Sequence, residues 1–178
     1  MTLKNCILEF LKIRYRFLQK DSPLDFCAHV RNANKLLVSL PSLVEERKVL
    51  QRYLKKLPEI FPNAEIHFLI QNVEKIPKNL PSNNVMVIKH DQLRFRFYPN
   101  RMLLHKIQNL GVDVYIDFNK HFDFVSVVLC NATKATIRIG FEDNRREPFF
   151  NLQIKAAPDS TGSKSYKSIF NFIESCTR

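Results

Sequence analysis

Hydrophobic positions along the chain follow two patterns: short consecutive runs typical of buried strands, and the three- and four-residue spacing typical of helices. Residues 2–20 have the helical spacing, and their apolar side chains fall on one broad face. The members of that face are Leu3, Cys6, Ile7, Phe10, Leu11, Phe17 and Leu18. The pattern predicts an amphipathic N-terminal helix, which a polar stretch over 21–34 connects to the rest of the chain.

Apolar runs of strand length recur after residue 34. They lie at 35–40, 64–70, 85–89, 112–118, 136–141 and 149–154. Most are apolar at consecutive positions rather than at alternate ones, which is typical of strands covered on both faces of a parallel sheet.

Helical patterns separate several of these strands. Ser42 and Glu45 fit a capping box, in which each side chain accepts a hydrogen bond from a backbone amide of the first turn. We expect the helix that they begin to continue to Leu57 and to end at Pro58.

Three further helices are expected in the second half of the chain. Asn100 is expected to cap one that Gly111 closes in the left-handed conformation, and 165–174 reads as a closing helix. Residues 122–131 fit either a strand or a helix. We favour the helix, because two parallel neighbouring strands need a crossover between them.

Strands that alternate with helices predict the α/β class. We expect one Rossmann-like domain over 35–178, with a mainly parallel five- or six-stranded sheet and helices on both faces. The N-terminal amphipathic helix and its connector, 1–34, precede it. A chain of 178 residues can bury about 70% of its unfolded surface in one such domain.

The charge balance adds a preference for acidic partners. The chain has 28 Lys and Arg against 17 Asp and Glu, a net charge of +11, which favours nucleic acid, anionic lipid or phosphorylated ligands. The N-terminal helix has five basic residues against Glu9 alone, a local charge of +4. The expected basic interaction surface comprises Lys4, Lys12, Arg14, Arg16, Lys20, Arg94, Arg96 and Arg101.

Two interpretations of the N-terminal helix stay open. It packs on the domain with a solvated basic side, or it lies on anionic lipid or in the groove of a partner protein. The stretch 93–101 is also open to two interpretations, because three arginines are interleaved with three aromatic residues. It binds a nucleic-acid backbone and stacks bases, or it is a half-buried edge strand with Phe95 and Phe97 inward. We favour the edge strand.

Several kinds of site are excluded or unsupported. The three glycines are more than twenty residues apart, so neither a dinucleotide-binding nor a P-loop motif is present. The five histidines lack zinc-site spacing, and we expect no metal and no cofactor. The four cysteines are expected to be free thiols, mostly buried, rather than a disulfide framework.

No cleavable signal or membrane-spanning run is apparent. The expected location is therefore the cytoplasm, with peripheral attachment to the inner face of the membrane if the N-terminal helix binds lipid.

The order of the elements resembles a known family over about residues 35–141. The matching pieces are the strand 35–40 with its following helix, FPNAEI at 61–66, VDVYIDF at 112–118 and RIGF at 138–141. They resemble the N-terminal, acceptor-side domain of the heptosyltransferase-type glycosyltransferases, which add ADP-heptose to lipopolysaccharide core. The full layout is also similar to a short bacterial family of unknown function.

The resemblance implies a general base after the first strand, where the family has a Gly-Asp pair. Glu45 and Glu46 align there, so Glu46 would be the retained carboxylate, while Glu45 has its capping role. The resemblance also implies a second domain for the nucleotide-sugar, which we expect this chain to lack. Transfer needs donor and acceptor held together.

Ligands of open α/β sheets bind beyond the carboxyl ends of the strands. The polar residues expected at that edge are Ser42, Glu45, Asp117, Asn119 and Lys120. They form either a polar-ligand crevice or ordinary loop caps and turns, and we favour the latter.

The sequence thus predicts a non-catalytic binding or assembly module that resembles half a glycosyltransferase. Its basic surface would meet a protein partner or an anionic membrane. The alternative is a sugar-transfer enzyme subunit whose donor site comes from a partner chain. Nucleic-acid binding is a third, less favoured possibility.

Overall fold

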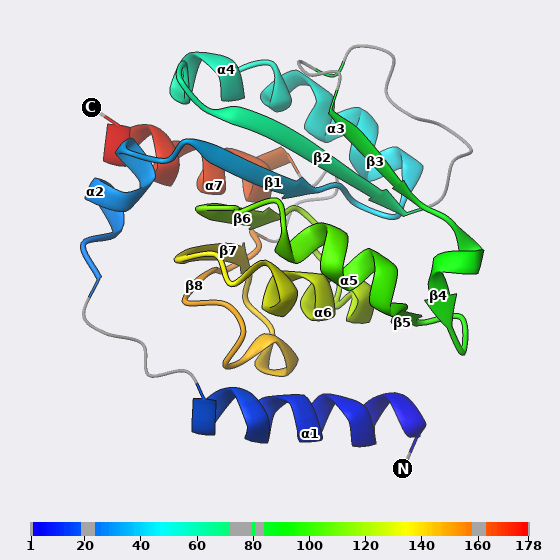
Figure 1. The fold of residues 1–178 in the computed structure, drawn as a ribbon. Coiled ribbons are helices and arrows are strands. Elements are labelled where there is room, and N and C mark those ends of the chain that lie inside the picture. The colour runs from blue at the N-terminus through cyan, green and yellow to red at the C-terminus, as the bar shows by residue number, and fades with distance from the viewer. Residues whose placement is uncertain (1, 19–23, 72–79, 81–83, 158–162, 178) are drawn as a thin grey trace.

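The computed structural model of the chain describes residues 2–18, 24–71, 80, 84–157 and 163–177. Six strands form one sheet in the order β3-β2-β1-β6-β7-β8 (Figure 1), and every neighbouring pair is parallel. The strands are β1 Lys35–Ser39, β2 Glu65–Gln71, β3 Val85–Ile88, β6 Val114–Asp117, β7 Ile137–Phe141 and β8 Leu152–Ile154. The α/β fold with a parallel sheet is confirmed.

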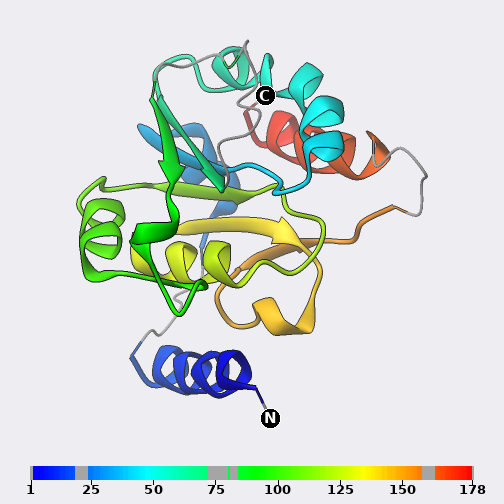
Figure 2. The same ribbon diagram turned by 90° about the vertical axis from the view of Figure 1, so that its right-hand side faces the viewer.

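Helices cover both faces of this sheet (Figure 2). They are α1 Leu3–Leu18, α2 Phe26–Arg31, α3 Val44–Leu54, α4 Leu57–Ile60, α5 Arg101–Gln108, α6 Phe124–Thr133 and α7 Ser163–Thr177. Short 3-10 turns are η1 His90–Gln92 and η2 Asn144–Arg146, and a small hairpin pairs β4 Leu93–Arg94 with β5 Tyr98–Pro99.

The two cores follow from the alternation of side chains along the strands. On β1, Leu36 and Val38 face the core shared with α2, α3, α4 and α7, whereas Leu37 faces the core shared with α1, α5 and α6. Every one of these three side chains is fully buried. Burial on both sides explains why the strands lack the apolar and polar alternation of a half-exposed sheet.

The N-terminal helix α1 packs on the domain along one of its faces. Leu8, Leu11 and Tyr15 are buried there, and the Tyr15 ring meets the edge of Phe149 with ring centres 5.5 Å apart. Helix α1 lies on the outer side of α6 (Figure 1). Because α6 is covered in this way, it is apolar and buried on nearly every side. This arrangement settles the ambiguous stretch at 122–131 as a helix, begun by Asp123, whose carboxylate accepts the Ser126 amide at 2.7 Å.

The predicted capping box at the start of α3 is wrong. The helix begins at Val44, and its N-cap residue, Leu43, makes no side-chain cap bond. Ser42 lies one residue too early to cap the helix; its amide instead donates to the Asn119 side chain at 3.0 Å. The Glu45 carboxylate is occupied by Lys48 at 2.9 Å.

The predicted ends of two helices also need correction. Pro58 does not end a helix: α3 stops at Leu54, and Pro58 lies in the first turn of α4, where its missing N–H leaves no hydrogen bond unmade. Gly111 has the expected left-handed backbone, with φ +63°, but α5 ends at Gln108 with Asn109 as its C-cap. The cap at Asn100 is confirmed, since its side chain accepts the Leu103 amide at 2.9 Å.

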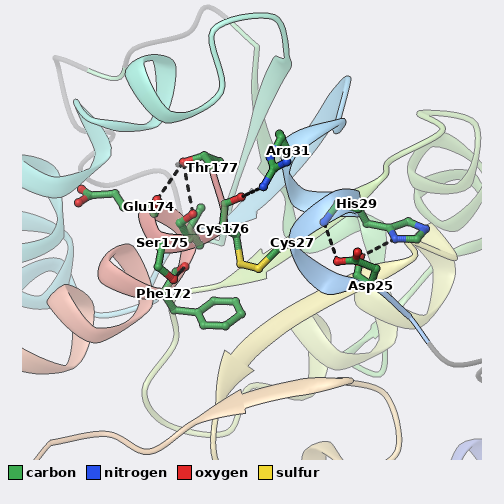
Figure 3. The surroundings of a disulfide bond; sticks show 11 residues. Asp25, Cys27, His29, Arg31, Phe172, Glu174, Ser175, Cys176 and Thr177 are labelled. Atoms are coloured by element: carbon green, nitrogen blue, oxygen red, sulfur yellow. Dashed lines mark hydrogen bonds between the residues drawn. A yellow bond between two sulfur atoms is a disulfide. The ribbon is translucent and has the colours of Figure 1, made fainter.

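The expectation of four free thiols is wrong for two of them. Cys27 on α2 forms a disulfide with Cys176 on α7 (Figure 3), although 149 residues separate them in sequence. Helix α2, which the sequence patterns did not reveal, brings Cys27 within 4.4 Å of Cys176, measured between Cα atoms. Cys6 is a free, exposed thiol, and Cys130 is free and buried.

Candidate functional site

The strand order places a topological switch between β1 and β6. The chain leaves β1 toward β2 on one side, and later returns to β6 on the other side of β1. The loops after β1 and β6 therefore diverge at the carboxyl edge of the sheet, where open α/β folds bind their ligands.

Asp117 and Asn119 tie these two loops together. One oxygen of the buried Asp117 carboxylate accepts the Asn119 amide at 3.0 Å and the Asn119 side chain at 2.7 Å. The Asn119 side chain in turn accepts the Ser42 amide at 3.0 Å. Both residues, expected at a ligand crevice, thus satisfy backbone groups of the fold.

Arg146 is a buried cation at the same edge that sequence reasoning missed. Its side chain is completely buried and donates to the carbonyls of Phe141, Asn119 and His121 at 3.1, 2.5 and 3.0 Å. The guanidinium lies 3.6 Å from the second oxygen of Asp117. Burial raises the pKa of Asp117, and the charge of Arg146 opposes that rise.

Gly140 gives Arg146 its space, and it is the one sequence signal that could have pointed to a buried group here. A Cβ atom at Gly140 would lie 2.9 Å from the Phe150 ring and 3.0 Å from the Arg146 guanidinium. A glycine inside a strand often marks such a close approach.

Hydroxyl groups continue this polar network beneath the edge. The Tyr115 hydroxyl lies 2.7 Å from that of Ser126, which donates to Ser39 on β1 at 3.2 Å. Burial, and then the nearby Asp117 carboxylate, raise the pKa of Tyr115 well above its ordinary value. These groups hold the strand ends and the start of α6 in register.

Glu46 and Lys120 form the partly exposed part of the edge. Their charged groups are 3.2 Å apart, and the Lys120 ammonium lies 5.7 Å from the centre of the Tyr166 ring. Burial, followed by the charge of Glu46, raises the pKa of Tyr166. Glu46 therefore does lie at the carboxyl edge, and a cation holds it there.

The predicted basic residues are divided among several places. Lys4 and Arg96 line one groove, beside α1 and the β4–β5 hairpin, and Arg14 lines another between α1 and α5. Lys12 pairs with Glu9 at 3.1 Å. The remaining described residues of the set are exposed and line neither groove: Arg16, Arg94 and Arg101. Lys20 lies outside the described residues.

The stretch 93–101 is not an edge strand. It forms the β4–β5 hairpin, whose tip residues Phe95 and Arg96 both have left-handed backbones, with φ of 51° and 63°. Phe95, expected to point inward, is 72% exposed, whereas Phe97 is half-buried against Phe124. The tight turn breaks the alternation from which the edge strand was inferred.

Helix α1 has a second apolar face that the domain does not cover. Leu3, Phe10, Ile13 and Phe17 are 53%, 63%, 53% and 82% exposed, respectively. Together with the exposed Cys6, they recur at steps of three and four residues, so they form one stripe along the helix. We call these five residues the outer stripe.

None of the helices in the described part of the chain has the length and apolar character needed to cross a membrane. No three His, Cys, Asp or Glu side chains in that part of the chain are grouped so that they could hold a metal ion.

Comparisons with known proteins place the fold. No protein-family model and no curated protein sequence matches the chain. Among solved structures, a glycosyl transferase family 9 protein from Veillonella parvula DSM 2008 is similar with a TM-score of 0.61, at 15% identity, over 79% of this chain and 41% of that one. The E. coli heptosyltransferase WaaC with ADP is similar with a TM-score of 0.54, at 15% identity, over 78% and 46%.

The predicted resemblance to heptosyltransferase-type enzymes is therefore confirmed at the level of the fold. The chain spans less than half the length of both structures.

Proposed function

We propose that this chain is a non-catalytic binding module that docks on an anionic membrane surface through α1. The observation that carries the proposal is the outer stripe, in which Phe10 and Phe17 are 63% and 82% exposed on a strongly basic helix. A contiguous exposed apolar patch with a polar rim marks an interaction surface rather than ordinary protein surface.

The charge around the outer stripe favours anionic lipid over a second copy of the chain. Arg14 and Arg16 fall on opposite sides of the stripe on a helix of 3.6 residues per turn, and Glu9 is the only acidic residue of α1. Two copies packed stripe to stripe would bring these cations together. An anionic surface instead attracts each of them, by about 1 kcal/mol per basic residue near the membrane.

The shape of the molecule allows such docking. Helix α1 lies at the periphery of the molecule (Figures 1 and 2). Its residues Leu8, Leu11 and Tyr15 are buried against the domain, whereas the outer stripe is exposed. A helix with this division can lie in the plane of the membrane interface with its apolar side buried among the acyl chains. The arginine stems can extend along the apolar surface while their charged ends reach the headgroups.

Vesicle binding tests the proposal. We expect the full chain to bind vesicles that contain phosphatidylglycerol and to bind pure phosphatidylcholine much more weakly, and we expect added salt to weaken the binding. Replacing Phe10 and Phe17 by serine removes two rings that each contribute about 1.5 kcal/mol or more when buried. The double variant should lose about a hundredfold in partition coefficient, measured by flotation.

The control replaces Met102 on α5, which is 81% exposed and outside the stripe, by serine. That variant should bind as the unchanged protein does. Equal recovery of all three proteins with and without anionic lipid would rule out docking on an anionic membrane. Retention on a partner protein in its place would identify the stripe as a protein interface.

A sugar-transfer enzyme subunit remains the second candidate function. The observation that favours it is the placement of Glu46, paired with Lys120 at the carboxyl edge, in a fold similar to part of a glycosyltransferase. If a partner chain or a second copy supplies the donor wall, a nucleotide-sugar should raise the melting temperature of the assembled complex, because a ligand of the native state stabilises it. An unchanged melting temperature across common donors would count against this function.

A further inference from the structure

A groove of about 350 Å³ opens beside the N-terminal end of α1. Its walls come from α1, from the tip of the β4–β5 hairpin, from the loop between β6 and α6, and from η2. The groove thus joins two basic segments that are far apart in sequence. Three cations line it, Lys4, Arg96 and Arg145, together with the aromatic rings of Phe97 and Phe122.

The aromatic rings hold two of these cations at the wall. The Lys4 ammonium lies 5.1 Å from the centre of the Phe97 ring, and the Arg145 guanidinium lies 4.3 Å from that of Phe122. Such contacts are favourable. Lys4 and Arg145 are therefore held beside the groove by rings of the domain.

Two carboxylates lie in or near the groove. Asp123 lines it, and one of its oxygens accepts two neutral donors, the Gln71 side chain and the Ser126 amide, both at 2.7 Å. Asp143 binds the Arg145 guanidinium at 2.9 and 2.7 Å. Within the part of the chain that the structure describes, Lys4 and Arg96 form no ion pair, and the first turn of α1 contains no acidic residue.

We propose that this groove binds a phosphate group, as a phosphate mono- or diester of a small molecule or of a lipid headgroup. The three cations of the groove outnumber the two carboxylates in or near it, Asp123 and Asp143, and Lys4 and Arg96 are in no ion pair with either. The guanidinium of Arg96 matches the geometry of phosphate oxygens. The helix dipole of α1 adds a favourable field at its N-terminal end. The rings of Phe97 and Phe122 can contact the apolar part of the ligand.

The groove contains none of the residues of the outer stripe, so phosphate binding here is separate from the proposed docking on membranes. A lipid headgroup would reach the groove while α1 lies on a bilayer, whereas a free phosphorylated molecule would reach it from solution. The two sources share the same chemistry, so the experiment needs one probe for each.

The experiment titrates the full chain with glycerol 3-phosphate, and separately with monomeric short-chain phosphatidylglycerol, by calorimetry at constant ionic strength. We expect saturable binding of at least one probe. Arg96→Gln should weaken that binding about tenfold or more, since it removes a charge-assisted hydrogen-bond donor. Arg94→Gln is the matched control: it removes an exposed arginine of the same hairpin that does not line the groove, and it should change binding less than about twofold.

Each outcome has a defined meaning. Binding of glycerol 3-phosphate supports a soluble ligand, and binding of the short-chain lipid alone supports a headgroup. Equal losses in the two arginine variants, or no saturable binding of either probe, would overturn the groove as a phosphate site. Replacing Phe10 and Phe17 should leave glycerol 3-phosphate binding unchanged, so a failure of the groove and a failure of membrane docking can be told apart.

Discussion

Replacing Arg146 by methionine is expected to lower the free energy of unfolding by about 3–5 kcal/mol, because it removes one partner of a buried ion pair. The methionine fills a similar space, but it cannot donate to the carbonyls of Phe141, Asn119 and His121 that Arg146 satisfies. It also leaves the buried Asp117 carboxylate without its cation. Denaturant unfolding of the variant and the unchanged protein measures the difference.

The loss should depend on pH in a defined direction. Burial raises the pKa of Asp117, and the Arg146 charge opposes that rise; without Arg146, the pKa of the folded carboxyl rises further. A carboxyl whose pKa is raised by folding binds its proton more tightly in the folded state. The free energy of unfolding therefore falls as the pH rises above the unfolded pKa of about 3.9 toward the raised value. We expect a smaller deficit at pH 5 than at pH 8.

The neighbouring arginine provides a matched control. Arg145 is exposed and pairs with Asp143 at the surface, so Arg145→Met should cost no more than about 1 kcal/mol. Adding Asp117→Asn to the Arg146 variant should recover part of the lost stability, because the uncompensated charge is gone. If the two arginine variants were equally stable, Arg146 would not be what joins the loops at the carboxyl edge.

The main elements were predictable from the sequence because local signals and burial agree. The consecutive apolar residues 114–116 need a covered sheet, and the sheet in turn needs the helices between its strands. Helix α6 was the hardest of these elements to predict, because a helix covered on nearly all sides has little periodicity in its hydrophobic residues. The requirement for a crossover between parallel strands decided it correctly.

The residues that lie at the carboxyl edge could be predicted, but the contacts of their side chains could not. Strand ends position Asp117, Asn119 and Lys120 through the backbone, whereas the direction of each side chain depends on partners far away in sequence. Arg146 lies 25 residues after His121 and 27 after Asn119, whose carbonyls it binds. No sequence pattern in this charged turn indicates that Arg146 is buried. The capping box predicted at Ser42 is wrong for the same reason, because the Ser42 amide donates to the side chain of the distant Asn119.

The disulfide is the clearest case of a contact that only the tertiary fold creates. Cys27 lies in a polar connector and Cys176 near the end of the described chain, and neither belongs to a recognisable cysteine motif. Helix α2 is only six residues long, too short to show a reliable periodicity. Its Val30 nevertheless enters the core shared with α7, and this packing brings the two sulfur atoms together.

Breaking the Cys27–Cys176 bond is expected to lower the free energy of unfolding by about 2–5 kcal/mol, because the bond joins residues 149 positions apart and restricts the unfolded chain. Cys27→Ser, Cys176→Ser and the double variant should lose the same amount, since each removes the same bond. A reductant should bring the unchanged protein to the stability of the double variant and leave that variant unaffected. Cys6→Ser, which removes an exposed free thiol, is the control and should change little.

Counting reactive thiols gives an independent measurement of the same bond. Without reductant, the native protein should expose one thiol, Cys6, because Cys130 is buried and its burial raises the pKa of the thiol, which suppresses the reactive thiolate. Unfolding should expose Cys130 as well, and reduction should then release Cys27 and Cys176. Four reactive thiols in the unreduced, unfolded protein, together with an unfolding midpoint that a reductant does not move, would show that α2 and α7 are held by packing alone.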